Sequence, residues 1–134
     1  MVDGRAQINE YDLGLPMPLE PLEARRQKVP RPVWDRLADA KRQVETVLGR
    51  RLVEMRLFGS YARGDFDEDS DVDVLVVARE LGAADRRAVT DAVIAASAGE
   101  IVLSPLVLTS ERLDELRMRE RILAQDLDRE GITL

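Results

Sequence analysis

Six acidic side chains and no basic one lie in the segment that runs from Gly64 to Asp73. They are Asp65, Asp67, Glu68, Asp69, Asp71 and Asp73. Carboxylates that lie close together repel one another and raise each other's pKa unless a positive charge lies among them. A divalent cation is the simplest source of that charge, so the segment is a candidate metal site.

Asp71 and Asp73 stand apart from the other four acids because they begin an apolar segment that continues through residues 74–77. Aspartate is disfavoured in strands, so strand stability does not explain these two residues. Side chains at positions i and i+2 of a strand point to one face, roughly 6.6 Å apart along the strand. Two such carboxylates suit Mg²⁺, which takes a few carboxylates together with water and substrate phosphates.

A calcium loop of the EF-hand type is the competing metal site. Asp65, Asp67 and Asp69 imitate its first three ligands. However, Ser70 stands where that loop needs glycine, and Val76 stands where it needs a bidentate glutamate. The EF-hand interpretation is therefore excluded.

The pair Gly59-Ser60 precedes the acidic segment and is typical of a phosphate-binding turn. Glycine lets the backbone approach a ligand closely, and Ser60 can offer its hydroxyl and its amide at the start of a short helix. Arg63, one turn later, can meet a phosphate oxygen, although pairing with Asp65 or Asp67 is the alternative. A Gly-Ser turn and an Asp-x-Asp pattern are each common, but together they indicate metal-assisted phosphoryl transfer.

The periodicity of the apolar residues predicts the elements that position these groups. The pattern predicts a helix over 33–48, strands over 51–58 and 72–77, a helix over 85–98, a strand over 101–108, and a last helix that begins at Thr109 or Ser110 and ends before Gly131. Because Pro105 removes one ladder donor, the third strand is expected to lie at a sheet edge or to carry a bulge. The predicted class is α/β (α+β), a small mixed sheet backed by helices.

Two burial patterns belong to these elements. Val53, Met55 and Leu57 are expected on one face of the first strand, and four leucines form the expected buried stripe of the last helix: Leu113, Leu116, Leu123 and Leu127. Residues 1–32 hold five of the six prolines and are predicted to be an extended arm that docks on its own domain or on a partner. Residues 33–134 then form the domain.

Composition excludes several classes of protein. The 134 residues carry 20 Lys and Arg against 26 Asp and Glu, a net charge of −6, and contain no His and no Cys. Thiolate catalysis, imidazole bases, the usual zinc sites and Ser-His-Asp triads are therefore excluded. An acidic chain with few aromatic residues disfavours direct binding of nucleic acid. No apolar run approaches the ~20 residues that a membrane span needs, and the expected compartment is the cytoplasm.

The string GSYARG…SDVDVLVV resembles the motif of the nucleotidyltransferase superfamily of DNA polymerase β, in particular its minimal nucleotidyltransferase branch. The family pattern is Gly-Ser, a spacer of about ten residues, and then acid-hydrophobic-acid-hydrophobic. The resemblance covers roughly residue 33 to the C-terminus and implies the polymerase β-type nucleotidyltransferase fold. It leaves the proline-rich arm unexplained.

The resemblance also implies roles for individual residues. Gly59 and Ser60 would hold the triphosphate of ATP or another NTP, and Asp71 and Asp73 would ligate Mg²⁺. The third carboxylate of the family belongs on a later strand that faces the first two. Glu100 is the only acid at the start of that strand, so it is either the third catalytic ligand or the ligand is missing.

Members of this branch often act as the antitoxin beside a HEPN-type toxin, a small helical ribonuclease, and some transfer AMP from ATP to a toxin tyrosine. The resemblance therefore implies a nucleotidyltransferase that modifies a partner protein. A catalytically impaired module that neutralises its partner by association is the alternative, and a purely structural subunit without nucleotide affinity is a third. The sequence also leaves open whether the protein forms a homo-oligomer.

Overall fold

The computed structural model describes residues 19–119 and 121–134, apart from the side chains of residues 121–124. The elements in chain order are α1 (Leu22–Lys28), α2 (Arg31–Leu48), the short 3-10 helix η2 (Gly49–Arg51), β2 (Leu52–Phe58), α3 (Ser60–Arg63), β3 (Val72–Ala78), α4 (Ala83–Ala95), β4 (Leu103–Thr109), α5 (Ser110–Arg119), α6 (Arg121–Glu130) and β5 (Ile132–Thr133). The expected α+β class with a small mixed sheet is confirmed.

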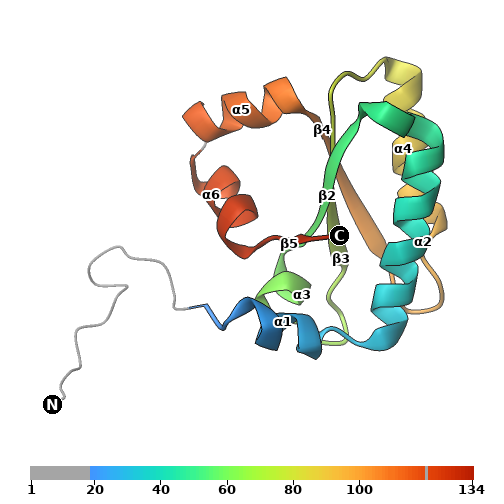
Figure 1. Ribbon diagram of the computed structural model, residues 1–134. Coiled ribbons are helices and arrows are strands. Elements are labelled where there is room, and N and C mark those ends of the chain that lie inside the picture. The colour runs from blue at the N-terminus through green and yellow to red at the C-terminus, as the bar shows by residue number, and fades with distance from the viewer. Residues whose placement is uncertain (1–18, 120) are drawn as a thin grey trace, which may run out of the picture.

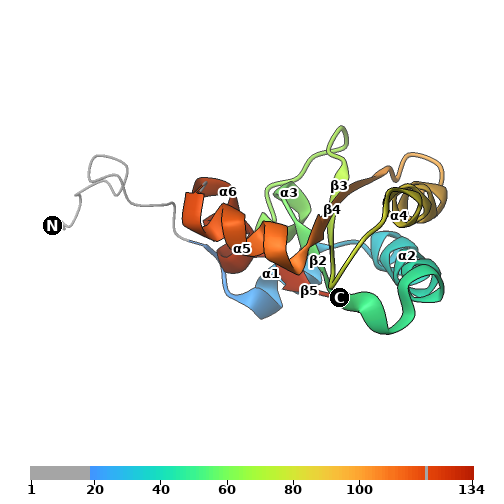
Figure 2. The same ribbon diagram turned by 90° about the horizontal axis from the view of Figure 1, so that it is seen from above.

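The sheet lies between two layers of helices, with α2 and α4 on one face and α5 and α6 on the other (Figures 1 and 2). The strand order is β4-β3-β2-β5. β3 pairs parallel with β4 and antiparallel with β2, and β2 pairs antiparallel with β5. β4 is an edge strand, as Pro105 predicts, because proline has no N–H for a second ladder.

The central strand β3 is buried on both faces, which explains its unbroken apolar run. Val72, Val74 and Val76 pack into the core beneath α2 and α4. Leu75 and Val77 alternate with them and pack against α5 and α6. Asp71 and Asp73 continue the second set, so they share the face that α5 and α6 cover.

Helix α2 buries one side of every turn against the sheet. Its buried residues recur at spacings of three and four: Val33, Leu37, Ala40, Val44 and Leu48. The helix begins two residues before the predicted start because Pro32 fits the first turn, where its missing N–H costs nothing. It ends at Leu48, as predicted, and the next residue, Gly49, has φ 54°.

The prediction of an extended arm is wrong for residues 22–28, which form α1. This helix is too short to show a period, and its stability comes from packing rather than propensity. Its Arg25 is buried, as is Val29 just after it. Residues 1–18 of the predicted arm lie outside the described residues, and the boundary between arm and domain at residue 32 stays a prediction.

Val53 does not share the buried face of β2 with Met55 and Leu57. The pairing of β2 with β3 shifts register between Leu52 and Glu54, and this irregularity leaves Val53 44% exposed. Met55 and Leu57 are buried as expected. The bulge, which no local signal marks, is the reason for the difference.

The predicted last helix is two helices, α5 and α6, followed by the unpredicted strand β5. Leu113, Leu116 and Leu127 all pack into one cluster on the same face of the sheet. In a single straight helix, Leu113 and Leu127 would lie roughly 20 Å apart along the axis. Folding the chain back brings both against the sheet, and Arg117 joins the two helices by donating to Asp128 at 2.9 and 3.1 Å.

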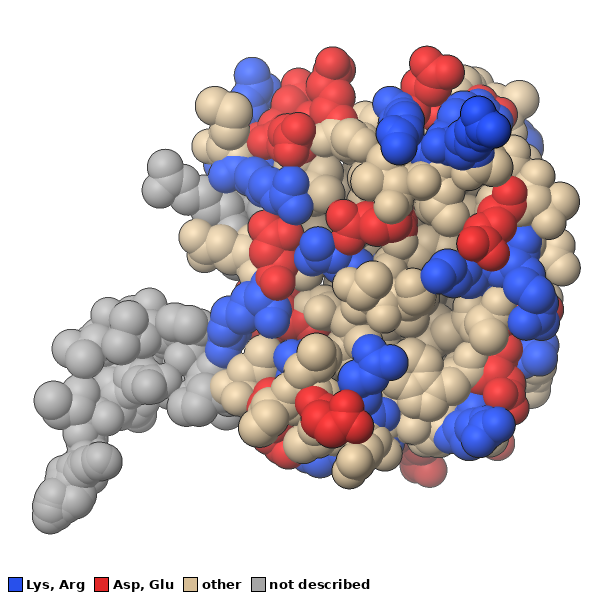
Figure 3. Space-filling model, viewed as in Figure 1, with Lys and Arg blue, Asp and Glu red and all other residues tan. Residues whose placement is uncertain are grey.

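Charges of both signs are interspersed over the face that Figure 3 shows, without a large area of one sign. Within residues 19–119 and 121–134, no helix has the length and apolarity that crossing a membrane requires.

Candidate active site

The candidate site begins where β2 ends, at a turn that only glycine can make. Gly59 has φ 73° and ψ −155°, a conformation that residues with a Cβ rarely adopt. A Cβ at this position would lie 2.1 Å from Asp73 Oδ2. The Gly59 backbone and the Asp73 carboxylate are therefore in direct contact, as Phe58 is the register partner of Asp73 across the two strands.

The short helix α3 follows Gly59 directly. Its first intrahelical bonds run from the amides of Ala62 and Arg63 to the Gly59 carbonyl oxygen, each at 3.0 Å. The amides of Ser60 and Tyr61 precede these bonds, and such first amides of a helix are the groups that bind phosphate. α3 thus presents donors beside the Asp73 carboxylate.

Asp71 and Asp73 lie on one face of the chain at the start of β3, as the spacing predicts. Asp71 is exposed and Asp73 is half-buried. Partial burial raises the pKa of Asp73 above its ordinary value, the charge of Asp71 raises it further, and the charge of Arg63 opposes both. The pair carries negative charge that a cation would stabilise.

Two other acids of the segment already have structural partners. Asp65 accepts a hydrogen bond from Arg63 Nε at 3.2 Å. Asp67 Oδ1 accepts from the Asp69 amide at 2.8 Å and from the Ser70 hydroxyl at 3.3 Å, which closes a turn. The structure therefore separates these acids, which shape the loop, from the pair on β3.

Arg63 has two carboxylate partners in the structure. Besides Asp65, its Nη1 donates to Glu130 Oε1 at 3.4 Å. The alternative of pairing with an acid, which the sequence left open, is what the geometry shows. Contact between Arg63 and a phosphate stays a prediction.

Tyr61 and Phe66 form a contact that the sequence analysis missed. Their rings stack with centroids 4.2 Å apart and planes 9° from parallel, which ties α3 to the acidic loop. The chain has only two Phe and two Tyr. One of each flanking Gly64 was the signal that could have revealed the pair.

The motif resemblance implies a third carboxylate on the strand that is β4 in the structure. Ser104 is the register partner of Asp73 on β4 and shares its face. Glu100 is exposed in the turn before β4. Among the described residues no three acidic side chains come together in a group able to hold a metal ion, so Glu100 does not join Asp71 and Asp73. Its role as a catalytic ligand stays a prediction.

Residues 40–123 match the family model of the nucleotidyltransferase domain. The match covers more than half of the 134 residues, and the chain belongs to this family. The resemblance seen in the Gly-Ser and Asp-x-Asp motifs is confirmed.

Two curated relatives come from Methanocaldococcus jannaschii. The one named "Putative protein adenylyltransferase MJ0141" is 49% identical over 45 residues, which are 34% of this chain and 46% of the relative. The one named "Putative protein adenylyltransferase MJ0604" is 59% identical over 27 residues, 20% of this chain and 27% of the relative. The matched part thus spans less than half the length of either relative.

A solved structure described as a "putative nucleotidyltransferase" from Sulfolobus solfataricus has a similar fold. It superposes with a TM-score of 0.51 at 21% sequence identity, over 82% of this chain and 85% of that chain. The likeness extends the agreement in fold beyond the residues that the family model matches.

Proposed function

We propose that this protein is a Mg²⁺-dependent nucleotidyltransferase that transfers AMP from ATP to a hydroxyl group of a partner protein. The observation that carries the proposal is the contact between Gly59 and the Asp73 carboxylate. It joins the phosphate-binding turn to the carboxylate pair at one point. Phosphoryl transfer depends on positioning and charge stabilisation, which this junction provides.

The residues at the site fit a magnesium ion. Asp71 and Asp73 offer hard carboxylate oxygens, and partial burial, together with the charge of Asp71, raises the pKa of Asp73. When bound there, Mg²⁺ would offset the charge of the phosphates and lower the pKa of an attacking hydroxyl.

The protein's own groups would orient the nucleotide. The first amides of α3 would donate to phosphate oxygens, and Gly59 allows the close approach that this requires. In the transfer, the acceptor oxygen forms a bond to the α-phosphorus and the bond to the leaving pyrophosphate breaks. Without histidine in the chain, the proton of the acceptor hydroxyl would pass to a carboxylate or to water.

We further propose that the acceptor is a small helical toxin of the HEPN type. The motif resemblance supports this partner, and the names of the two relatives, both putative protein adenylyltransferases, support a protein as the acceptor. Within the described residues, one sheet with its helices forms the fold.

A catalytically impaired module that binds its partner is the second candidate. Ser104 favours it, because this residue lies beside Asp73 on the strand where the family carries its third carboxylate. Such a protein would hold nucleotide and metal without turnover. Incubating the protein with the candidate toxin and labelled ATP separates the two, because only the first candidate transfers label.

Binding of ATP is expected to require a divalent ion. Three phosphates brought to Asp71 and Asp73 would otherwise meet like charge. Calorimetric titration with ATP in the presence of Mg²⁺, and again with a chelator, measures this directly. Equal affinity in the two titrations would contradict the proposed site.

Glu100→Gln tests the third carboxylate. If Glu100 swings toward the metal during transfer, the substitution leaves ATP binding nearly intact and lowers the transfer rate about 10²-fold, the scale of losing a catalytic acid or base. Glu80→Gln is the matched control, because Glu80 is an exposed acid just beyond the other end of β3. An unchanged rate would show that Glu100 is a solvated turn residue. The proposed site would then have two carboxylates, with Ser104 rather than an acid beside Asp73.

A further inference from the structure

Arg25 and Glu130 are the two charged residues that are buried among those described, at 5% and 6% exposure. Arg25 lies on α1, and Figure 1 shows α1 next to α3 at one end of the sheet. The Arg25 guanidinium donates three hydrogen bonds to backbone carbonyls. Nε donates to Glu20 at 2.9 Å, and Nη1 donates to Ala62 at 2.9 Å and to Glu130 at 2.7 Å.

These partners are unusual for a buried arginine. No carboxylate among the described residues pairs with Arg25. Its guanidinium hydrogen-bonds only to carbonyl oxygens of these residues. Ala62 lies in α3, and Glu130 is the last residue of α6. Carbonyls at helix C-termini lack intrahelical partners and carry partial negative charge. Arg25 therefore joins three segments that are far apart in the sequence.

Helix α3 needs such support from outside. Four residues cannot form a stable helix on their own, because the conformational entropy lost in forming the first turn exceeds the gain from its few hydrogen bonds. Arg25 donates a hydrogen bond to the Ala62 carbonyl of this helix, and the Glu130 carboxylate accepts one from Arg63 at its end. α1 also packs close to the end of α3, because a Cβ on Gly64 would lie 3.0 Å from Lys28 Cδ.

Both supports lie outside residues 40–123, the part that matches the family model. Arg25 precedes that part and Glu130 follows it, yet the two converge on α3. The same end of the molecule is hollowed by a pocket of about 320 Å³, whose lining includes Lys28, Arg63 and Glu130. The flanking segments of the chain are therefore coupled to the turn that begins the site.

We propose that Arg25 is a positioning residue that holds α3, and with it the Gly59-Ser60 turn, in the geometry that receives the nucleotide phosphates. The inference rests on the proposed function for its consequence in ATP binding. The Arg25 bond to the Ala62 carbonyl fixes the C-terminal end of α3. The N-terminal end of α3 follows Gly59, whose added Cβ would lie 2.1 Å from Asp73 Oδ2, so fixing the helix would also fix this turn beside Asp73.

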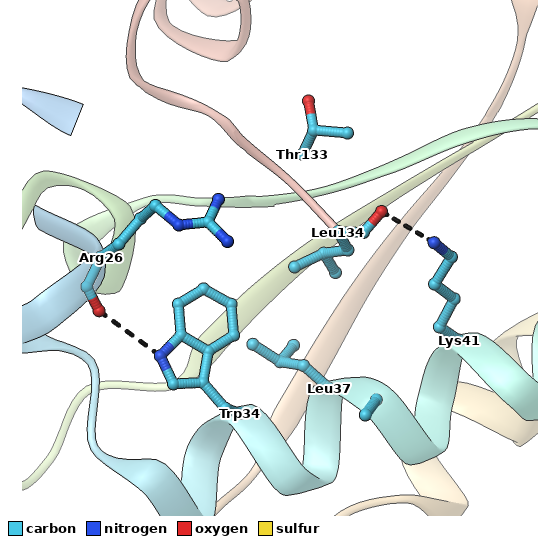
Figure 4. Close-up of a pocket in the computed structure, with 7 residues that line it drawn as sticks. Arg26, Trp34, Leu37, Lys41, Thr133 and Leu134 are labelled. Atoms are coloured by element: carbon cyan, nitrogen blue, oxygen red, sulfur yellow. Dashed lines mark hydrogen bonds between the residues drawn. The ribbon is translucent and has the colours of Figure 1, made fainter. Parts of the chain in front are cut away.

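A separate apolar pocket of about 220 Å³, shown in Figure 4, is lined by Arg26 of α1, by residues of α2 and by Thr133 and Leu134. There the Arg26 guanidinium lies 5.5 Å above the Trp34 ring. Arg26 thus packs α1 onto α2, whereas Arg25 reaches α3. The two neighbouring arginines give α1 two separate attachments.

Arg25→Gln tests the proposal with two readouts. Hydrogen exchange should speed up at the amides of residues 62–65, which bond to the carbonyls of Gly59 and Ser60, while amides of β2 and β3 keep their protection. The KM for ATP with Mg²⁺ should rise about tenfold, with a smaller change in kcat. Arg25→Lys keeps the charge and should restore part of both losses.

Arg31→Gln is the matched control, because the Arg31 side chain is 87% exposed and should leave both readouts unchanged. Unaltered exchange in α3 together with an unaltered KM in folded Arg25→Gln would overturn the proposal. If Arg25→Gln does not fold, Arg25→Lys is judged by the same two readouts. A wild-type protein that binds no ATP would refute the proposed function, and the exchange of the α3 amides would then decide the role of Arg25 alone.

Discussion

Replacing Gly59 with alanine is expected to abolish ATP binding and to destabilise the fold. The backbone conformation at Gly59 costs any other residue ~1–3 kcal/mol. In addition, the new methyl group would lie 2.1 Å from Asp73 Oδ2. Either the turn or the carboxylate must move, so the phosphate donors and the metal ligands lose their relative position. Calorimetry with ATP and Mg²⁺, together with thermal unfolding, measures both effects.

Gly49→Ala separates backbone strain from the contact with Asp73. Gly49 also has a positive φ, 54°, but no atom lies within 4 Å of the position that its Cβ would take. We expect this variant to lose stability by a similar strain while it keeps its affinity for ATP. Equal affinities of the two variants would show that the Gly59 contact is not part of the site.

Asp73→Asn is expected to lower the rate of transfer by about 10³-fold or more, since it removes a carboxylate that would hold the Mg²⁺ ion, and this cation offsets negative charge in the transition state. Asp71→Asn should have the same effect. Both variants should have a thermal midpoint at pH 7 that is unchanged or higher, because each relieves repulsion between the carboxylates. A loss of folding would favour a purely structural role for the pair.

The gain in stability of Asp73→Asn should depend on pH. Because its pKa is raised on folding, Asp73 holds its proton more tightly in the folded state than in the unfolded chain. Ionised Asp73 therefore lowers the free energy of unfolding above the folded pKa, and this cost disappears as the pH falls toward the ordinary value of 3.8. Thermal midpoints of the two proteins should converge there.

Asp69→Asn is the control for removing charge from the same segment. Asp69 is exposed, and its backbone amide donates a hydrogen bond to Asp67 Oδ1. Transfer by this variant should stay within about twofold of the wild type, as expected for a solvated surface acid. A comparable loss of activity would mean that the whole segment, rather than the pair on β3, carries the function.

The core of the candidate site was predictable because its signals are local. Aspartate is disfavoured in strands, yet Asp71 and Asp73 stand at the start of β3. Gly59 stands where the chain turns sharply after β2. These departures from local preference are readable in one sequence. The three strands β2, β3 and β4 followed from their apolar residues, and their ends were correct to within one or two positions, whereas the two-residue strand β5 was missed.

The supports of the site were not predictable because they depend on distant contacts. Arg25 looks like an ordinary surface arginine until Ala62 and Glu130 are brought to it by the fold. Ser104 acquires its meaning from the register of β4 against β3, which no local pattern sets. The separation of α5 from α6 likewise follows from the need to cover one sheet face rather than from a breaking residue.

The antiparallel pairing of β2 with β3 has a consequence for the order of folding. Gly59 and Asp73 are separated by 13 residues that include α3, so the turn and the carboxylates meet when β2 pairs with β3, before any contact that spans a longer part of the chain is needed. β4 must wait for the crossover through α4, and β5 pairs with Arg56 only after residue 131 has been placed. We therefore expect the Gly59 turn and the two carboxylates to come together early in folding. The contacts of Arg25 and Glu130 that hold α3 are expected to form later.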